Sequence, residues 1–241
     1  MMLHTRGIVF RTVKYGETSV IADIYTEKKG LQTFIAGGVR KAKAKISPSL
    51  LQVMSLVDLV SYFREQKEMH RLKEIKSGYW FQEISRDVIK SSVGLFMLEI
   101  AQKSIKEAEE NLPLFNFLWN SLVFVDENRG SLANIPLSFM MNLSAYLGFF
   151  PGGTTPEDST IFDLQEGHFT DQSPGHTYYL SEDETKAWWS LMQFDFDQCQ
   201  SISISRETRK DLLRQMILYY RLHIENFKEP QSHRIFESVF H

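Results

Sequence analysis

The most cationic segment of the chain follows a pair of glycines. Residues 37–45 have the sequence Gly-Gly-Val-Arg-Lys-Ala-Lys-Ala-Lys, which places Arg40, Lys41, Lys43 and Lys45 within six residues. Closely spaced Lys and Arg side chains neutralise phosphates and release counterions, and paired glycines let the backbone approach a ligand. The segment therefore predicts a loop that contacts phosphate groups. Taken alone, it is also compatible with a solvated loop whose charge serves only solubility.

The wider charge distribution favours contact with phosphate. Residues 1–76 contain 14 Lys and Arg against 7 Asp and Glu, net +7, whereas the remainder contains 13 against 23, net −10, within an overall charge of −3. This asymmetry predicts a basic module beside an acidic one. Supporting cations of the basic part include Arg6, Arg11, Lys14, Lys28, Lys29, Arg64, Lys67, Arg71 and Lys73.

Aromatic residues are interspersed among these cations. A cationic groove with exposed rings binds single strands, because the groove follows the backbone while the rings stack on bases. Alternating rings also fill the interiors of barrels. The ring that we expect to be exposed is Tyr15, since it lies in a predicted turn. The others are Phe10, Tyr25, Phe34, Tyr62 and Phe63.

The basic part has the alternating pattern of short strands. Five strands with one long connection after the third predict an OB-type barrel over residues 1–78, although an SH3-like barrel would give a similar pattern. The predicted strands span residues 7–13, 19–26, 31–36, 56–63 and 69–75.

From about residue 80 the apolar period becomes helical, which predicts a mainly helical domain over residues 79–241 and an α+β fold class. Pro136 suits a first helical turn, and Ser181 with Glu184 forms a capping-box pattern. Glycines and prolines predict an irregular insertion at about residues 149–176, with a short hairpin at 161–170. Helices are predicted around Val93 to Ile105 and at residues 114–125, 136–147, 182–194 and 206–227.

Composition narrows the class of protein. The 241 residues are 43% hydrophobic and 24% charged, as in globular domains. An alternating pattern begins at the N-terminus and no apolar run reaches about 18 residues, so we expect a cytoplasmic protein with no membrane partner. The single cysteine, Cys199, excludes an intramolecular disulfide and a cysteine-rich zinc site.

Catalytic patterns are missing from the sequence. It has no G-x-x-x-x-G-K-[ST], G-x-S-x-G or G-x-G-x-x-G motif. His168 and His176 lie in the predicted insertion without a third spaced ligand, and His223 lacks the H-E-x-x-H spacing. Asp195 and Asp197 are interpreted as a helix end. We therefore predict no catalytic residue, no metal and no cofactor.

Several of these segments resemble the RecO family. Residues 6–17, 19–26, 29–30 and 36–41 are similar to the family's N-terminal barrel in order and spacing. Leu143-Ser-Ala-Tyr-Leu-Gly-Phe-Phe-Pro151 is similar to its leucine-rich helix ending in Leu-Gly-x-x-Pro, and residues 219–227 with Ser232 agree with its C-terminal part.

The resemblance implies a recombination mediator that binds single- and double-stranded DNA and anneals complementary strands. It also implies action with RecR to help RecA displace single-strand-binding protein, associated with the nucleoid. Many RecO proteins carry a four-cysteine zinc site after Leu-Gly-x-x-Pro, but residues 152–176 contain no cysteine, so we predict no zinc. Where the family commonly has a basic residue in the leucine-rich helix, this chain has Asn142.

The sequence thus predicts a non-enzymatic DNA-binding protein. One alternative is an OB barrel that binds only an acidic protein partner. Another is a metal-dependent hydrolase built from scattered acids and histidines. The predicted DNA-binding residues are Arg40, Lys41, Lys43, Lys45, Arg6, Arg11, Lys14, Tyr15, Lys28, Lys29, Arg64 and Arg71.

Overall fold

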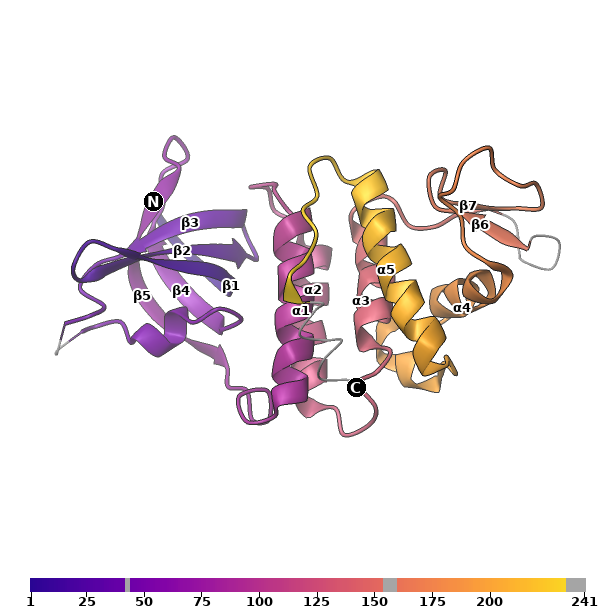
Figure 1. Cartoon of the computed structure of the whole chain (residues 1–241). Helices are drawn as coiled ribbons and strands as arrows, with labels where there is room; N and C mark the ends of the chain where they lie inside the picture. Colours follow the sequence, from indigo (N-terminus) through magenta and orange to yellow (C-terminus); the bar gives the residue numbers. More distant parts are fainter. Residues whose placement is uncertain (42–43, 154–159, 233–241) are drawn as a thin grey trace. The chain divides into compact units, whose positions relative to one another are not determined.

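The computed structural model describes residues 1–41, 44–153 and 160–232 (Figure 1). Five strands form a closed barrel, and helices follow it, which confirms the predicted α+β class and the OB-type barrel. The strands are β1 (Met2–Tyr15), β2 (Ser19–Thr26), β3 (Gly30–Ala36), β4 (Leu56–Tyr62) and β5 (Met69–Tyr79).

Strand order around the barrel is β1-β2-β3-β5-β4. The long strand β1 pairs with both β2 and β4, and all pairings are antiparallel except that of β3 with β5. That short parallel pairing closes the barrel, so the strands of the closed sheet have no long unpaired edge. The connection between β3 and β4 contains the 3-10 helix η1 (Pro48–Leu51).

The barrel interior is filled by alternate residues of the five strands. Ile24, Phe34 and Val57 are fully buried there, together with Val39 and Leu51 from the β3–β4 connection. Burial of such side chains stabilises the fold by about 1.5 to 3 kcal/mol each relative to exposure. The interior is therefore an apolar core, and any ligand must bind outside it.

A helix covers one outer side of the barrel. Phe10 of β1 stacks on Tyr25 of β2, with ring centroids 5.5 Å apart, and Tyr25 in turn stacks on Phe115 at 6.3 Å. Phe115 belongs to α2 (Leu112–Glu127). Gly78 allows Trp119 of the same helix to approach, because a Cβ atom at Gly78 would lie 2.7 Å from the Trp119 ring.

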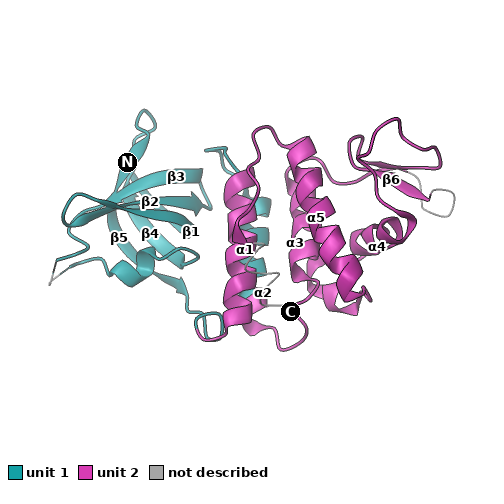
Figure 2. Cartoon of the chain, in the orientation of Figure 1, with its two compact units in different colours: residues 1–85, 105–123 teal, residues 86–104, 124–241 magenta. Residues whose placement is uncertain are grey.

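The segment that covers the barrel belongs to the same compact unit as the barrel. We expected one division near residue 78, but the barrel forms a compact unit with Ile105–Val123 as well as Met1–Ser85 (Figure 2). The second unit comprises Arg86–Ser104 and Phe124–His241. The stacking of Tyr25 on Phe115 is the packing reason, since it buries aromatic surface that the strands cannot cover.

The second unit is helical. It contains α1 (Val88–Ser104), α3 (Ile135–Tyr146), α4 (Glu182–Met192) and α5 (Arg206–His223), with α3 packed against the other three. Pro136 lies in the first turn of α3, and Ser181 and Glu184 form the predicted capping box of α4. Helix α5 ends at His223, earlier than predicted, because Ile224 is extended and Asn226 has a φ of 56°.

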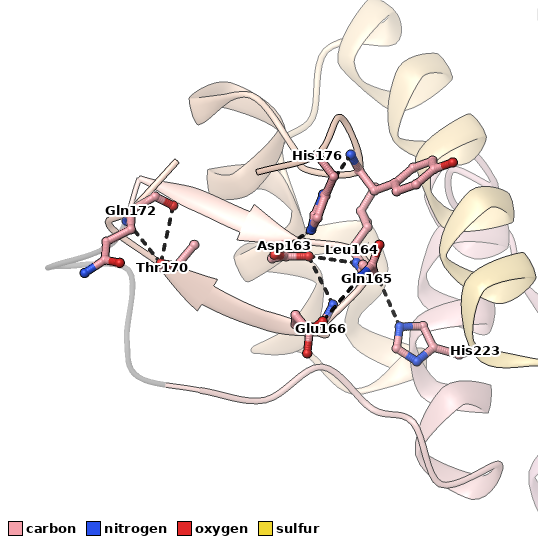
Figure 3. Close-up of polar contacts among 9 residues, drawn as sticks. Asp163, Leu164, Gln165, Glu166, Thr170, Gln172, His176 and His223 are labelled. Atoms are coloured by element: carbon pink, nitrogen blue, oxygen red, sulfur yellow. Dashed lines mark hydrogen bonds and ion pairs between the residues drawn. The ribbon is translucent and has the colours of Figure 1, made fainter. Parts of the chain in front are cut away.

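The predicted insertion contains the expected hairpin. Strands β6 (Ile161–Asp163) and β7 (His168–Thr170) pair in antiparallel fashion. Asp163 holds the turn, because its Oδ1 accepts bonds from the backbone N–H groups of Gln165 and Glu166 (Figure 3). One local prediction was wrong in detail: Asp195 and Asp197 do not end α4 but begin the 3-10 helix η2 (Phe196–Ser201).

Candidate nucleic-acid interface

An open groove of about 1010 Å³ lies on the outside of the barrel. Five cationic side chains line it, and no carboxylate is among its described lining residues. Phosphates are attracted to a surface of this kind, because a groove lined by one sign of charge focuses the field. The cations are Lys45, Arg64, Lys67, Arg71 and Lys73.

The pairing of the strands determines which groove residues lie side by side. Tyr62 on β4 is the direct partner of Met2 on β1 and of Arg71 on β5, and Arg71 is also the partner of Ile35 on β3. Directly paired residues point to the same face of a sheet, with Cβ atoms about 4.5 to 5.5 Å apart. Met2, Tyr62, Arg71 and Ile35 therefore form one row across four strands.

A bulge in β5 sets which side chains face outward. The pairing of β4 with β5 shifts register between Val60 and Ser61, so that Lys73 is an extra residue between the partners of these two. A bulge reverses the alternation of a strand. As a result Arg71 and Lys73 are exposed, while Ile75 lies in the core.

Four of the groove cations form no ion pair in the described part of the chain; the fifth, Lys73, has its Nζ 3.3 Å from the carboxylate of Glu74. Side chains of Lys45, Arg64 and Lys67 are exposed. Their charges are therefore free to neutralise an anion without first breaking an internal pair.

The predicted phosphate-contacting loop borders the same groove. Gly37 and Lys45, at its two ends, line the groove, while Val39 is buried in the barrel core. The backbone N–H of Arg40 donates to the carbonyl of Thr18, 3.2 Å away, which fixes this part of the loop. Arg40 and Lys41 are exposed, and Lys43 lies outside the described residues.

The remaining predicted cations lie elsewhere on the barrel. Arg11 pairs with Asp23 at 3.7 Å, Lys28 donates to the carbonyl of His4 at 2.8 Å, and Lys29 pairs with Glu65 at 3.7 Å. None of these three, nor Lys14 at the end of β1, is among the described residues lining the large groove. The structure thus brings together Lys45, Arg64 and Arg71 of the predicted set, with Arg40 and Lys41 on the bordering loop.

Arg6 makes contacts within the protein and is not among the described residues lining the groove. Its guanidinium donates to Glu27 at 2.8 Å and to Asn116 at 3.1 Å, and it lies 5.1 Å from the ring centroids of both Phe115 and Trp119. The hydrogen bond from Arg6 lowers the pKa of Glu27. Arg6 therefore holds the covering helix on the barrel, and we do not include it in the groove.

The rings divide between the interior and the surface. Phe10, Tyr25, Phe34 and Phe63 are buried. Tyr15 is 53% exposed, as expected, and so is Tyr62 at 50%, which the sequence did not distinguish from its buried neighbours. Lys67, Lys73, Tyr62, Met2 and Met69 were not among the predicted DNA-binding residues but line the groove.

His70 is a buried neighbour of the groove residues Phe63 and Arg64. Its Nδ1 accepts a bond from the Arg64 N–H at 3.5 Å, which assigns the ring proton to Nε2, and Nε2 donates to Gln32 at 3.1 Å. The ring stacks on Phe63 at 4.2 Å. Burial lowers the pKa of His70, so the ring is neutral at pH 7.

Two histidines of the second unit contact other residues of the protein. His223 donates from Nε2 to the carbonyl of Leu164 at 2.9 Å, and His176 lies 3.3 Å from Asp163 (Figure 3). Asn142 donates to the carbonyl of Ser138 at 2.9 Å.

Within residues 1–41, 44–153 and 160–232, no three His, Cys, Asp or Glu side chains gather as a metal site. In the same ranges, no helix is long and apolar enough to cross a membrane.

Comparison with known proteins agrees over the whole chain. Residues 1–79 match the family "Recombination protein O N terminal", and residues 85–233 match "Recombination protein O C terminal". The chain belongs to the RecO family. The DNA repair protein RecO of Christiangramia forsetii is 34% identical over 241 residues, and those of Phocaeicola vulgatus and Bacteroides fragilis are each 32% identical over 240 and 241 residues. In all three cases the match covers 100% of both chains, and RecO membership supports a role in DNA repair and recombination.

Proposed function

We propose that this chain binds DNA along the barrel groove and acts as a recombination mediator that makes or breaks no covalent bond itself. The observation that carries the proposal is the groove with five cations and no carboxylate among its described lining residues. Cations in such an arrangement replace the counterions of phosphates on either single or double strands. The exposed Arg40 and Lys41 extend the cationic surface beyond the groove.

The mechanism is electrostatic and positional. Two strands that bind a cationic surface lose much of their mutual repulsion, so complementary segments can meet and pair. From the resemblance to the RecO family, we propose further that the protein acts in the cytoplasm with a RecR-like protein. Together they would help RecA to load on DNA coated by single-strand-binding protein.

Annealing by the purified full-length chain tests this function. Two complementary labelled oligonucleotides are mixed with the protein, with and without a chelator, and pairing is followed by energy transfer. We expect acceleration that the chelator does not change. Replacing Lys45, Arg64 and Arg71 by alanine should weaken strand binding by about tenfold or more and slow annealing. The matched control replaces Lys186, Lys210 and Arg221, three exposed cations of the second unit.

Three results would contradict the proposal. Equal losses in the groove and control variants would show that overall charge, and not the groove, is responsible. No binding of either strand at low salt would favour the alternative in which the barrel meets an acidic protein partner. Strand cleavage that requires a divalent metal would favour the hydrolase alternative.

A further inference from the structure

Tyr62 is more exposed than most of the other aromatic rings of the barrel. Phe10, Tyr25, Phe34 and Phe63 each pack against another ring within the protein, with centroid distances of 4.2 to 6.3 Å. Tyr62 is 50% exposed, and in the described part of the chain no aromatic ring packs on it. One face of this ring is therefore available to a ligand.

The apolar neighbours of Tyr62 are also exposed. Met2, its partner on β1, is 42% exposed, and Met69 on β5 is 39% exposed. All three residues line the same groove as its cations. Exposed apolar side chains that gather at a charged groove mark a binding surface more often than scattered ones do. The groove therefore offers exposed apolar side chains together with cations.

This combination matches one chemical class of ligand. A flat aromatic ring paired with Arg71 across the sheet, in a groove that Lys45, Arg64 and Lys67 also line, suits a group that has both a planar apolar face and a phosphate. An unpaired nucleotide has both, because its base presents a π-face for stacking. In a duplex the faces of the bases are covered by their neighbours, so a duplex presents phosphates, sugars and base edges but no free base face.

We propose that Tyr62 is a stacking platform for an unpaired base, so that the groove prefers single-stranded to duplex DNA. This inference rests on the proposed DNA-binding function of the groove. Tyr62 supplies the base contact, Met2 and Met69 add apolar surface, and Arg71, paired directly with Tyr62 across the sheet, meets the adjoining phosphate. Tyr15, the other exposed ring, is not among the described residues lining the groove.

The test compares two probes of equal length and charge. One is an oligothymidine of about 15 nucleotides, and the other is an abasic strand with the same phosphodiester backbone. The full-length chain should bind oligothymidine at least about 5-fold more tightly than the abasic strand, which is the low end for one stacked base. A duplex of the same length should gain no such advantage.

The variants separate stacking from charge. Tyr62→Ala and Tyr62→Leu should reduce the preference for oligothymidine to about twofold or less and leave abasic binding nearly unchanged, whereas Tyr62→Phe keeps the preference. Leucine retains apolar bulk on the strand, so it guards against a general effect on folding. The control Tyr178→Ala removes a 40% exposed tyrosine of the second unit and should change neither affinity.

The possible failures are distinguishable. If Tyr62→Ala and Tyr62→Leu both keep the wild-type preference, or if the wild type binds the two probes equally well, the stacking role is refuted while the groove stays a DNA site. If the variant lacking Lys45, Arg64 and Arg71 binds both probes as the wild type does, the groove itself is not the DNA site, and both proposals fall.

Discussion

Glu27 holds Arg6, which links the barrel to the helix that covers it. The Arg6 guanidinium donates to the Glu27 carboxylate at 2.8 Å and lies over Phe115 and Trp119 of α2. The Arg6 and Glu27 side chains are 36% and 22% exposed, respectively, so the pair is partly screened by solvent. Its contribution comes as much from the stacking of the guanidinium as from its charge.

Arg6→Ala should lower the free energy of unfolding by about 1 to 3 kcal/mol, since it removes three side-chain hydrogen bonds and a stacked guanidinium. Arg6→Lys should recover only part of this loss, because an ammonium cannot bridge Glu27 and Asn116 as a guanidinium does. Urea unfolding of both variants measures the difference. Equal stability of wild type and Arg6→Ala would contradict the structural role.

The same pair predicts a dependence on pH. The pKa of Glu27 is lowered in the fold by its hydrogen bond with Arg6. Its stabilising contribution is therefore present above the unfolded glutamate pKa of about 4.3 and is lost as the pH falls through the lower folded value. The stability difference between wild type and Arg6→Ala should therefore shrink in this acidic range, and the part due to stacking and to Asn116 should remain. A constant difference down to pH 2 would be inconsistent with the linkage.

The salt dependence of strand binding should reflect the groove. With five cations in contact with phosphates, log affinity for a single strand should fall with log salt at a slope of about −3 to −4, at about −0.7 per phosphate. The variant lacking Lys45, Arg64 and Arg71 should have a slope shallower by about 2. Titrations at several salt concentrations provide the measurement, and an unchanged slope in the variant would place the phosphate contacts elsewhere.

Substitutions in the loop that borders the groove should affect DNA binding and stability separately, because the loop has both exposed and buried residues. Arg40→Ala with Lys41→Ala should weaken DNA binding yet change the free energy of unfolding by about 0.5 kcal/mol or less, because both side chains are exposed. Val39→Ala in the same loop should instead destabilise the protein by roughly 1 to 3 kcal/mol, since Val39 is buried in the core. Melting and strand-binding curves of the two variants test the contrast, which fails if Arg40 and Lys41 prove dispensable for binding.

Cys199 should report on unfolding. Its side chain is fully buried, and this burial raises its pKa to about 11, so almost no thiolate exists at neutral pH. A thiol reagent should therefore modify Cys199 slowly in the native protein and rapidly in denaturant. Rapid modification without denaturant would mean that η2 opens readily.

Much of the barrel follows from the sequence, because alternation of apolar residues marks β2, β3 and β4 almost to their ends. Two features of the groove do not. A strict period of two would place Ile75 on the same face as Arg71, but the bulge at Lys73 turns Ile75 into the core. The row of Met2, Tyr62 and Arg71 depends on pairings between residues far apart in the sequence, which local pattern does not encode.

The covering helix was the main feature missed. Its apolar residues predicted a helix at 114–125 but not the surface on which that helix packs. The only local indication was that Phe10 and Tyr25 are large apolar residues beside the interior positions Val9 and Ile24. Four consecutive buried residues, Gly7 to Phe10, are too many for a strand with one solvated face, and burial on both faces of β1 accounts for them.

Because Ile105–Val123 packs on the barrel but follows it in the sequence, the barrel strands are synthesised before their cover. At about 5 to 20 residues per second, the ribosome takes roughly 2 to 9 seconds to add the residues from the end of β5 to Val123. During that interval all five strands exist while the aromatic surface of Phe10 and Tyr25 has no cover. We therefore expect the nascent barrel to expose this apolar surface until Phe115 and Trp119 have been added and can cover it.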